Sequence, residues 1–147
     1  MSLAKARLFS SPVARDMSAA DGGFYSATDA DSVTPQGHRD EGYYFTWTPK
    51  ELEKVLSPEQ LKAVMAYFSV TERGNFEGRN ILHTPKSIKE TAKHLGLTAD
   101  SLEKLISESK EILYQTREKR PAPLKDDKII TAWNGLMISA FAKAGFV

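Results

Sequence analysis

The stretch SIKETAKHLGLTADSLEKLISESKEIL, residues 87–113, decides the fold class because it carries two helix starts and a helix stop. Ser87 is followed three residues later by Glu90, which is the pattern of a capping box, and Gly96 is a residue that commonly ends helices. Thr98 is a good N-cap for a longer segment in which leucine and isoleucine recur at helical spacing. The stretch therefore predicts helices over 87–95 and 99–119.

Two further capping boxes lie nearer the N-terminus. Thr48 precedes Glu51 and Ser57 precedes Gln60, and in each box a proline occupies the first helical position. They predict helices over 49–56 and 58–69.

One more helix is expected near the C-terminus, after Pro121-Ala122-Pro123. Asp126 or Asp127 is its expected N-cap, and the residues that follow are apolar nearly all round the helix. Such a helix needs packing partners on every side, which a single face from each preceding helix does not supply.

Two short aromatic runs at 23–27 and 42–47 have the composition of strands, and residues 28–41 between them have that of a loop. Together with the helices they predict a mainly α fold with a small antiparallel β-hairpin. The first twelve residues are interpreted as a vector-derived or poorly ordered start, and 13–147 as one domain.

Composition excludes several classes of function. Twenty Lys and Arg against nineteen Asp and Glu give a net charge of +1, so no global field favours nucleic acid or an anionic membrane. There is no cysteine and no apolar run of the roughly 20 residues that span a bilayer. A soluble cytoplasmic protein without a membrane partner is expected.

Motifs for cofactors and metals are also missing from the sequence. It contains no GxGxxG, GxxxxGK[ST] or GxSxG pattern. His38, His83 and His94 lack the spacing of zinc ligands, so neither a metal nor a cofactor is expected.

Residues 91–106 resemble a helix-turn-helix, with Gly96 in the turn. Asp100 and Glu103 would begin the recognition helix and repel phosphates, so nucleic-acid binding is the weakest alternative.

The carboxylates are the first candidates for chemistry. Asp29 and Asp31 are two residues apart, so on an extended backbone both would face one side and could share a proton, bind a cation or hold sugar hydroxyls. Asx-turns within a loop are the alternative. Asp126 and Asp127, if held ionised at a helix start, could act as base or ligand, and plain capping is the alternative.

Aromatic side chains are the second group of candidates. Trp133 could stack on a sugar while Asn134 offers a donor and an acceptor, although core packing is the commoner use of tryptophan. Tyr25 and Trp47, in the two expected strands, could line a cleft or pack in the core.

Four segments together resemble a known family: 22–32 (GGFYSATDADS), 41–48 (EGYYFTWT), 74–83 (GNFEGRNILH) and 126–137 (DDKIITAWNGLM). In order and spacing they resemble the spermatogenesis-associated thioredoxin-like proteins, over roughly residues 13–147. The resemblance implies a thioredoxin-like domain joined to an α/α toroid related to N-acylglucosamine 2-epimerases and six-hairpin glycosidases, of which this chain would be a partial toroid.

The resemblance further implies a carbohydrate-active parent, an isomerase or a glycoside hydrolase, of which this chain alone would be an inactive piece. A non-catalytic scaffold or interaction domain is the alternative. The expected partners are a carbohydrate, the missing thioredoxin-like domain, the remaining toroid helices and a second copy held through exposed apolar faces. The expected catalytic residues are Asp29, Asp31 and Asp127, and the expected substrate-binding residues are Tyr25, Glu41, Trp47, Asp126, Trp133 and Asn134.

Overall fold

The computed structural model describes residues 13–145, so the expected start segment 1–12 lies outside the described residues. The chain divides into two compact units. The central unit is Asp31–Ala122, and the terminal unit combines Met1–Ala30 with Pro123–Val147.

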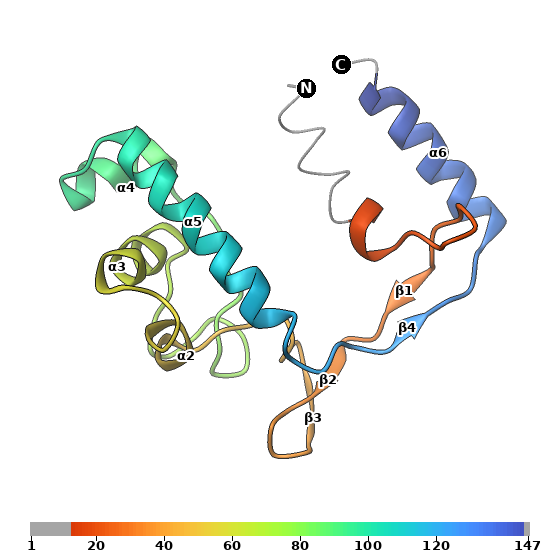
Figure 1. Cartoon of the computed structure of the whole chain (residues 1–147), viewed down its shortest axis with the longest axis horizontal. Coiled ribbons are helices and arrows are strands. Elements are labelled where there is room, and N and C mark those ends of the chain that lie inside the picture. Colours follow the sequence, from red (N-terminus) through yellow and green to blue (C-terminus); the bar gives the residue numbers. More distant parts are fainter. Residues whose placement is uncertain (1–12, 146–147) are drawn as a thin grey trace. The chain divides into compact units, whose positions relative to one another are not determined.

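Four helices form the frame of the central unit (Figure 1): α2 (Pro49–Glu53), α3 (Pro58–Tyr67), α4 (Ile88–Leu95) and α5 (Ala99–Arg117). All three predicted capping boxes are confirmed, with reciprocal side-chain to backbone hydrogen bonds at the starts of α2, α3 and α4. Thr98 caps α5 by accepting from the Ser101 N–H, and Gly96 ends α4 with a left-handed φ of 70°. Local sequence therefore fixes these helix ends.

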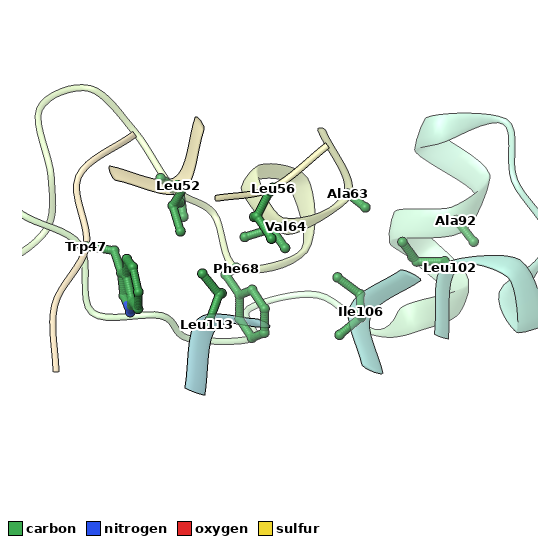
Figure 2. Packing of buried hydrophobic residues seen from close by; sticks show 11 residues of the cluster. Trp47, Leu52, Leu56, Ala63, Val64, Phe68, Ala92, Leu102, Ile106 and Leu113 are labelled. Atoms are coloured by element: carbon green, nitrogen blue, oxygen red, sulfur yellow. The ribbon is translucent and has the colours of Figure 1, made fainter. Parts of the chain in front are cut away.

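The core of the central unit lies where α5 packs against α3 and α4 (Figure 2). Leu102 and Val64 are fully buried there, and complete burial of such a side chain stabilises the fold by about 1.5–3 kcal/mol. The buried cluster comprises Trp47, Leu52, Leu56, Ala63, Val64, Phe68, Val70, Ala92, Leu102, Ile106 and Leu113.

The predicted strand over 42–47 is wrong. Residues 42–45 form a turn, in which Gly42 has a φ of 70° and its carbonyl accepts from the N–H groups of Phe45 and Thr46. The strands instead lie within the expected loop, where β2 (Asp31–Val33) pairs antiparallel with β3 (Arg39–Glu41). Tyr43, Tyr44 and Trp47 are buried with arginine guanidinium groups over their rings rather than by strand pairing, whereas Phe45 is exposed.

The terminal unit contains a helical turn at 13–16, a second small antiparallel sheet and a long helix. In the sheet β1 (Ala27–Thr28) pairs with β4 (Lys125–Asp126), and the helix is α6 (Thr131–Gly145). The predicted N-cap at Asp126 or Asp127 is wrong, because α6 begins at Thr131 and Asp126 belongs to β4. Pairing with a strand about a hundred residues away overrides the local capping pattern.

The chain is thus mainly helical with two small antiparallel sheets, where the sequence predicted one hairpin. The toroid remains a prediction.

Candidate carboxylate hollow and arginine cluster

The β1–β4 pair of the terminal unit brings two candidate carboxylates together. Asp29 and Asp126 both line a hollow of about 350 Å³ whose other walls are Ala27, Thr28, Leu124 and Lys125. The Asp29 N–H donates to the Leu124 carbonyl at 2.7 Å, while Asp126 is opposite Ala27. Residues in such diagonal positions are about 7–8 Å apart and lie on the same face of a strand pair.

Asp126 is held in its ionised form. The Lys128 ammonium lies 2.5 Å from its Oδ1. Hydrogen bonds from Lys128 and Ser26 lower the pKa of the Asp126 carboxyl below its ordinary value. An ionised carboxylate of this kind can serve as a base or as a ligand to hydroxyl groups, but it is a poor general acid.

The remaining predicted carboxylates do not join this pair. Asp127 lies beyond the other end of the short ladder, three residue positions from Asp29, or about 10 Å along the strands. A bend at residue 30 separates Asp29 from Asp31, so alternation along one strand does not apply to them. Asp31 starts β2 in the central unit, directly opposite Glu41 of β3.

Two predicted binding residues of the terminal unit take different roles. Asn134 is a structural clamp: its Oδ1 accepts from the Phe24 N–H at 2.7 Å, and its Nδ2 donates to the Phe24 carbonyl at 3.0 Å and to the Ile130 carbonyl at 3.1 Å. Trp133, by contrast, is 54% exposed. Its ring is available to a ligand or to another protein segment.

The other two aromatic candidates already contact basic side chains. The Lys125 ammonium lies 5.0 Å from the centre of the Tyr25 ring, at the edge of the carboxylate hollow. Trp47 is buried in the core of the central unit, and the Arg120 guanidinium covers its ring at 4.1 Å. This position fits the core-packing alternative for Trp47.

Arginine residues that the sequence analysis did not select organise the central unit. Arg120 donates from one terminal nitrogen to the carbonyls of Tyr43, Tyr44 and Thr46, at 2.8, 3.2 and 2.7 Å. Burial of the guanidinium lowers the pKa of Arg120, and the neighbouring Glu51 opposes this shift. The signal available in the sequence is the basic run of residues 117–120 (REKR) at the end of the 99–119 helix.

Arg79 completes this cluster. It donates to the Thr46 hydroxyl and carbonyl at 2.8 and 2.9 Å, and its terminal nitrogen lies 2.6 Å from the Glu51 carboxylate. Glu51 thereby joins the helix cap of α2 to the turn at 42–45. These contacts hold the aromatic turn in place and are structural in character.

Within residues 13–145 no group of three or more His, Asp or Glu side chains is arranged to hold a metal ion. None of the helices described for this chain has the length and apolar character needed to cross a membrane.

Comparison with known proteins identifies relatives by sequence. No protein-family model matches the chain. It is 38% identical to human spermatogenesis-associated protein 20 over 92% of its length, and 36% identical to the mouse protein of the same name over 90%. The chain is homologous to a segment of spermatogenesis-associated protein 20. An uncharacterized protein of Caenorhabditis elegans, B0495.5, is 32% identical over 84% of the chain.

The matched region is a small part of these relatives. The chain spans about one fifth of the length of spermatogenesis-associated protein 20 from human and mouse. The homology supports the family resemblance seen in the four sequence motifs.

Proposed function

We propose that this chain is one segment of a larger helical domain of the α/α toroid kind, and that the exposed face of α6 is where further helices of the longer protein pack. The single observation that carries the proposal is the distribution of buried apolar residues. Every buried hydrophobic residue in the described part of the chain belongs to the central unit. The terminal unit contains the most apolar of the described helices, and none of the side chains described in this unit is buried to that degree.

The exposed residues of α6 are large. Trp133, Leu136 and Ile138 are 54%, 71% and 65% exposed. Leu136 and Ile138 are two residues apart in α6 and therefore point to nearly opposite sides of the helix, so large apolar side chains are exposed around much of it. A helix that is apolar on several sides is one that other protein segments cover. Since the relatives are about five times as long as the matched region, proteins of this kind contain ample chain to supply the covering helices.

Tryptophan fluorescence tests the proposal because the chain has only two tryptophans, one buried and one exposed. In either polypeptide the emission lost in Trp133→Phe reports Trp133, and the emission lost in Trp47→Phe reports Trp47. In the isolated chain we expect acrylamide to quench the Trp133 emission strongly. In a polypeptide extended to the length of the relatives, the same emission should be shifted to the blue and protected.

The Trp47 emission serves as the internal control, because Trp47 is 3% exposed and should be protected in both proteins. Equal quenching of Trp133 in the short and long polypeptides would contradict the proposal. Protection that depends on the concentration of the isolated chain would assign the face to a second copy instead.

A second candidate function, carbohydrate binding in the parent protein, is favoured by the hollow lined by Asp29 and Asp126. The ionised Asp126 would accept from a sugar hydroxyl or act as base, and Tyr25, whose ring contacts the Lys125 ammonium, would supply an apolar ring face. Proton abstraction next to a carbonyl, or glycosidic cleavage, would be the reaction.

Calorimetric titration with a panel of mono- and oligosaccharides tests this second candidate in the longer polypeptide. We expect Asp126→Asn and Asp29→Asn to abolish binding, while Asp21→Asn, an exposed substitution outside the hollow in the same unit, leaves it intact. Absence of binding by the unsubstituted protein, or equal loss in all three variants, would exclude this function of the hollow.

A further inference from the structure

A second concave surface lies in the central unit, and Trp47 is among the residues that line it. It is a groove of about 330 Å³. Three core residues, Trp47, Phe68 and Leu113, form its floor, and Figure 2 shows them close together at one end of the core. Phe45 and Ile81, which are 47% and 48% exposed, form its apolar walls.

The charged groups that line this groove have one sign. They are Lys110 and Arg117, both on α5, and none of the lining residues is acidic. A mostly apolar pocket with a few convergent cationic groups suits a ligand that combines an apolar body with a negative charge.

Arg117 is incompletely paired. Its guanidinium lies over the rings of Tyr44, Phe45 and Tyr114, at 5.2, 5.7 and 5.2 Å from their centres. Its Nε is buried and has no hydrogen-bond partner among the described residues. This nitrogen is enclosed by protein atoms, but the two terminal nitrogens of a planar guanidinium that is fixed by aromatic rings can bind a carboxylate through two hydrogen bonds.

One acidic side chain competes with such a ligand. Oε1 of Glu118 lies 3.7 Å from a terminal nitrogen of Arg117 and also accepts from the Tyr44 hydroxyl at 2.7 Å. At 3.7 Å the contact with Arg117 is too long for a good hydrogen bond. A ligand carboxylate can therefore displace it.

We propose that the central unit binds a small organic acid in this groove, with its apolar body against Trp47 and Phe45 and its carboxylate against Arg117, assisted by Lys110. The volume of the groove fits a ligand of about a dozen non-hydrogen atoms, for which a dissociation constant of about 1 mM is reasonable.

The test uses 4-phenylbutyrate as the probe and its neutral amide, 4-phenylbutanamide, as the matched ligand control. Both are titrated into the full 147-residue chain, and the two indole N–H signals are followed by NMR. We expect the carboxylate to shift the signal of Trp47, which lines the groove, and to leave the signal of Trp133 unchanged. The amide should bind at least about tenfold more weakly, because it lacks the charge-assisted hydrogen bonds.

Substitutions locate the charge that is recognised. Arg117→Gln should reduce the affinity for the carboxylate to that for the amide, and Glu118→Gln should increase it by removing the competing charge while keeping an acceptor for Tyr44. Lys104→Gln on the same helix is the control and should change nothing, because Lys104 does not line the groove. Thermal unfolding of each variant checks that it folds. The comparison of phenylbutyrate with its amide uses only the unsubstituted chain, so it tests charge recognition even if a variant does not fold.

Equal affinity for phenylbutyrate and its amide would overturn the proposal, since the groove would then bind apolar groups without recognising charge. No shift of the Trp47 signal at 20 times the expected dissociation constant would overturn it as well. Inorganic phosphate that binds as strongly as phenylbutyrate would also overturn the proposal, because the apolar walls would then contribute nothing to the affinity.

Discussion

Replacing Asn80 with alanine should strongly reduce the unfolding free energy of the central unit. Asn80 is 1% exposed. Its amide donates to the carbonyls of Trp47 and Thr71 at 3.2 and 3.0 Å, and its Oδ1 accepts from the Thr71 N–H at 3.0 Å. Losing three hydrogen bonds at about 1 kcal/mol each predicts a loss of about 3 kcal/mol of unfolding free energy.

Asn75 provides a matched comparison. It makes the same kind of contacts, donating to the Ile81 carbonyl at 3.0 Å and accepting from the Ile81 N–H at 2.8 Å, but it is exposed. Water can replace these bonds, so Asn75→Ala should cost about 1 kcal/mol or less.

Urea unfolding followed by circular dichroism measures both variants. With an m-value of about 2 kcal/mol/M, Asn80→Ala should lower the midpoint by about 1.5 M and Asn75→Ala by about 0.5 M or less. Equal losses in the two variants would refute the reasoning, because burial would then not decide what these hydrogen bonds contribute.

Two further predictions concern a glycine and a helix cap. Gly74→Ala should be much more destabilising than Gly78→Ala in the same urea assay. Both glycines have a positive φ, of 75° and 72°. Only at Gly74 would an added Cβ meet backbone, because it would lie 2.3 Å from the Arg79 carbonyl oxygen. Similar losses would show that φ alone matters. Hydrogen bonds from Ser87 lower the pKa of Glu90 below its ordinary value, so the stability that its charge contributes is complete above the ordinary pKa of a glutamate and disappears as the pH falls through the lower folded-state pKa. Ser87→Ala should raise that pKa toward its ordinary value in an NMR titration, and an unchanged pKa would contradict the assignment.

Much of the helical fold was predictable because its signals are local. A capping box needs four consecutive residues, and the predicted boxes at Thr48, Ser57 and Ser87 all form. The sheets were not predictable in the same way. β1 and β4 pair across about a hundred residues, and two-residue strands leave no pattern of alternation to read.

The candidate site also depends on contacts between residues that are far apart in the sequence. Asp29 was selected from its motif, but its association with Asp126 depends on the register of the β1–β4 pair. Tyr43 and Tyr44 indicated a strand because aromatic residues favour strands, whereas their carbonyls in fact bind Arg120, which lies about 76 residues later. A contact at that separation leaves no trace in local sequence.

The energetics of the terminal unit connect its structure to the proposed packing face. Its two chain segments are joined by the Asn134 clamp on Phe24, by the stacked rings of Phe24 and Phe141 and by the short β1–β4 pair. Closing a flexible loop of about a hundred residues costs about 4 kcal/mol or more, although the folded central unit within the loop reduces this cost. A few hydrogen bonds at about 1 kcal/mol each leave a small surplus at best. Burial of Trp133, Leu136 and Ile138 by further helices would add about 1.5–3 kcal/mol for each side chain, and it is therefore the packing of α6 that would make this unit stable.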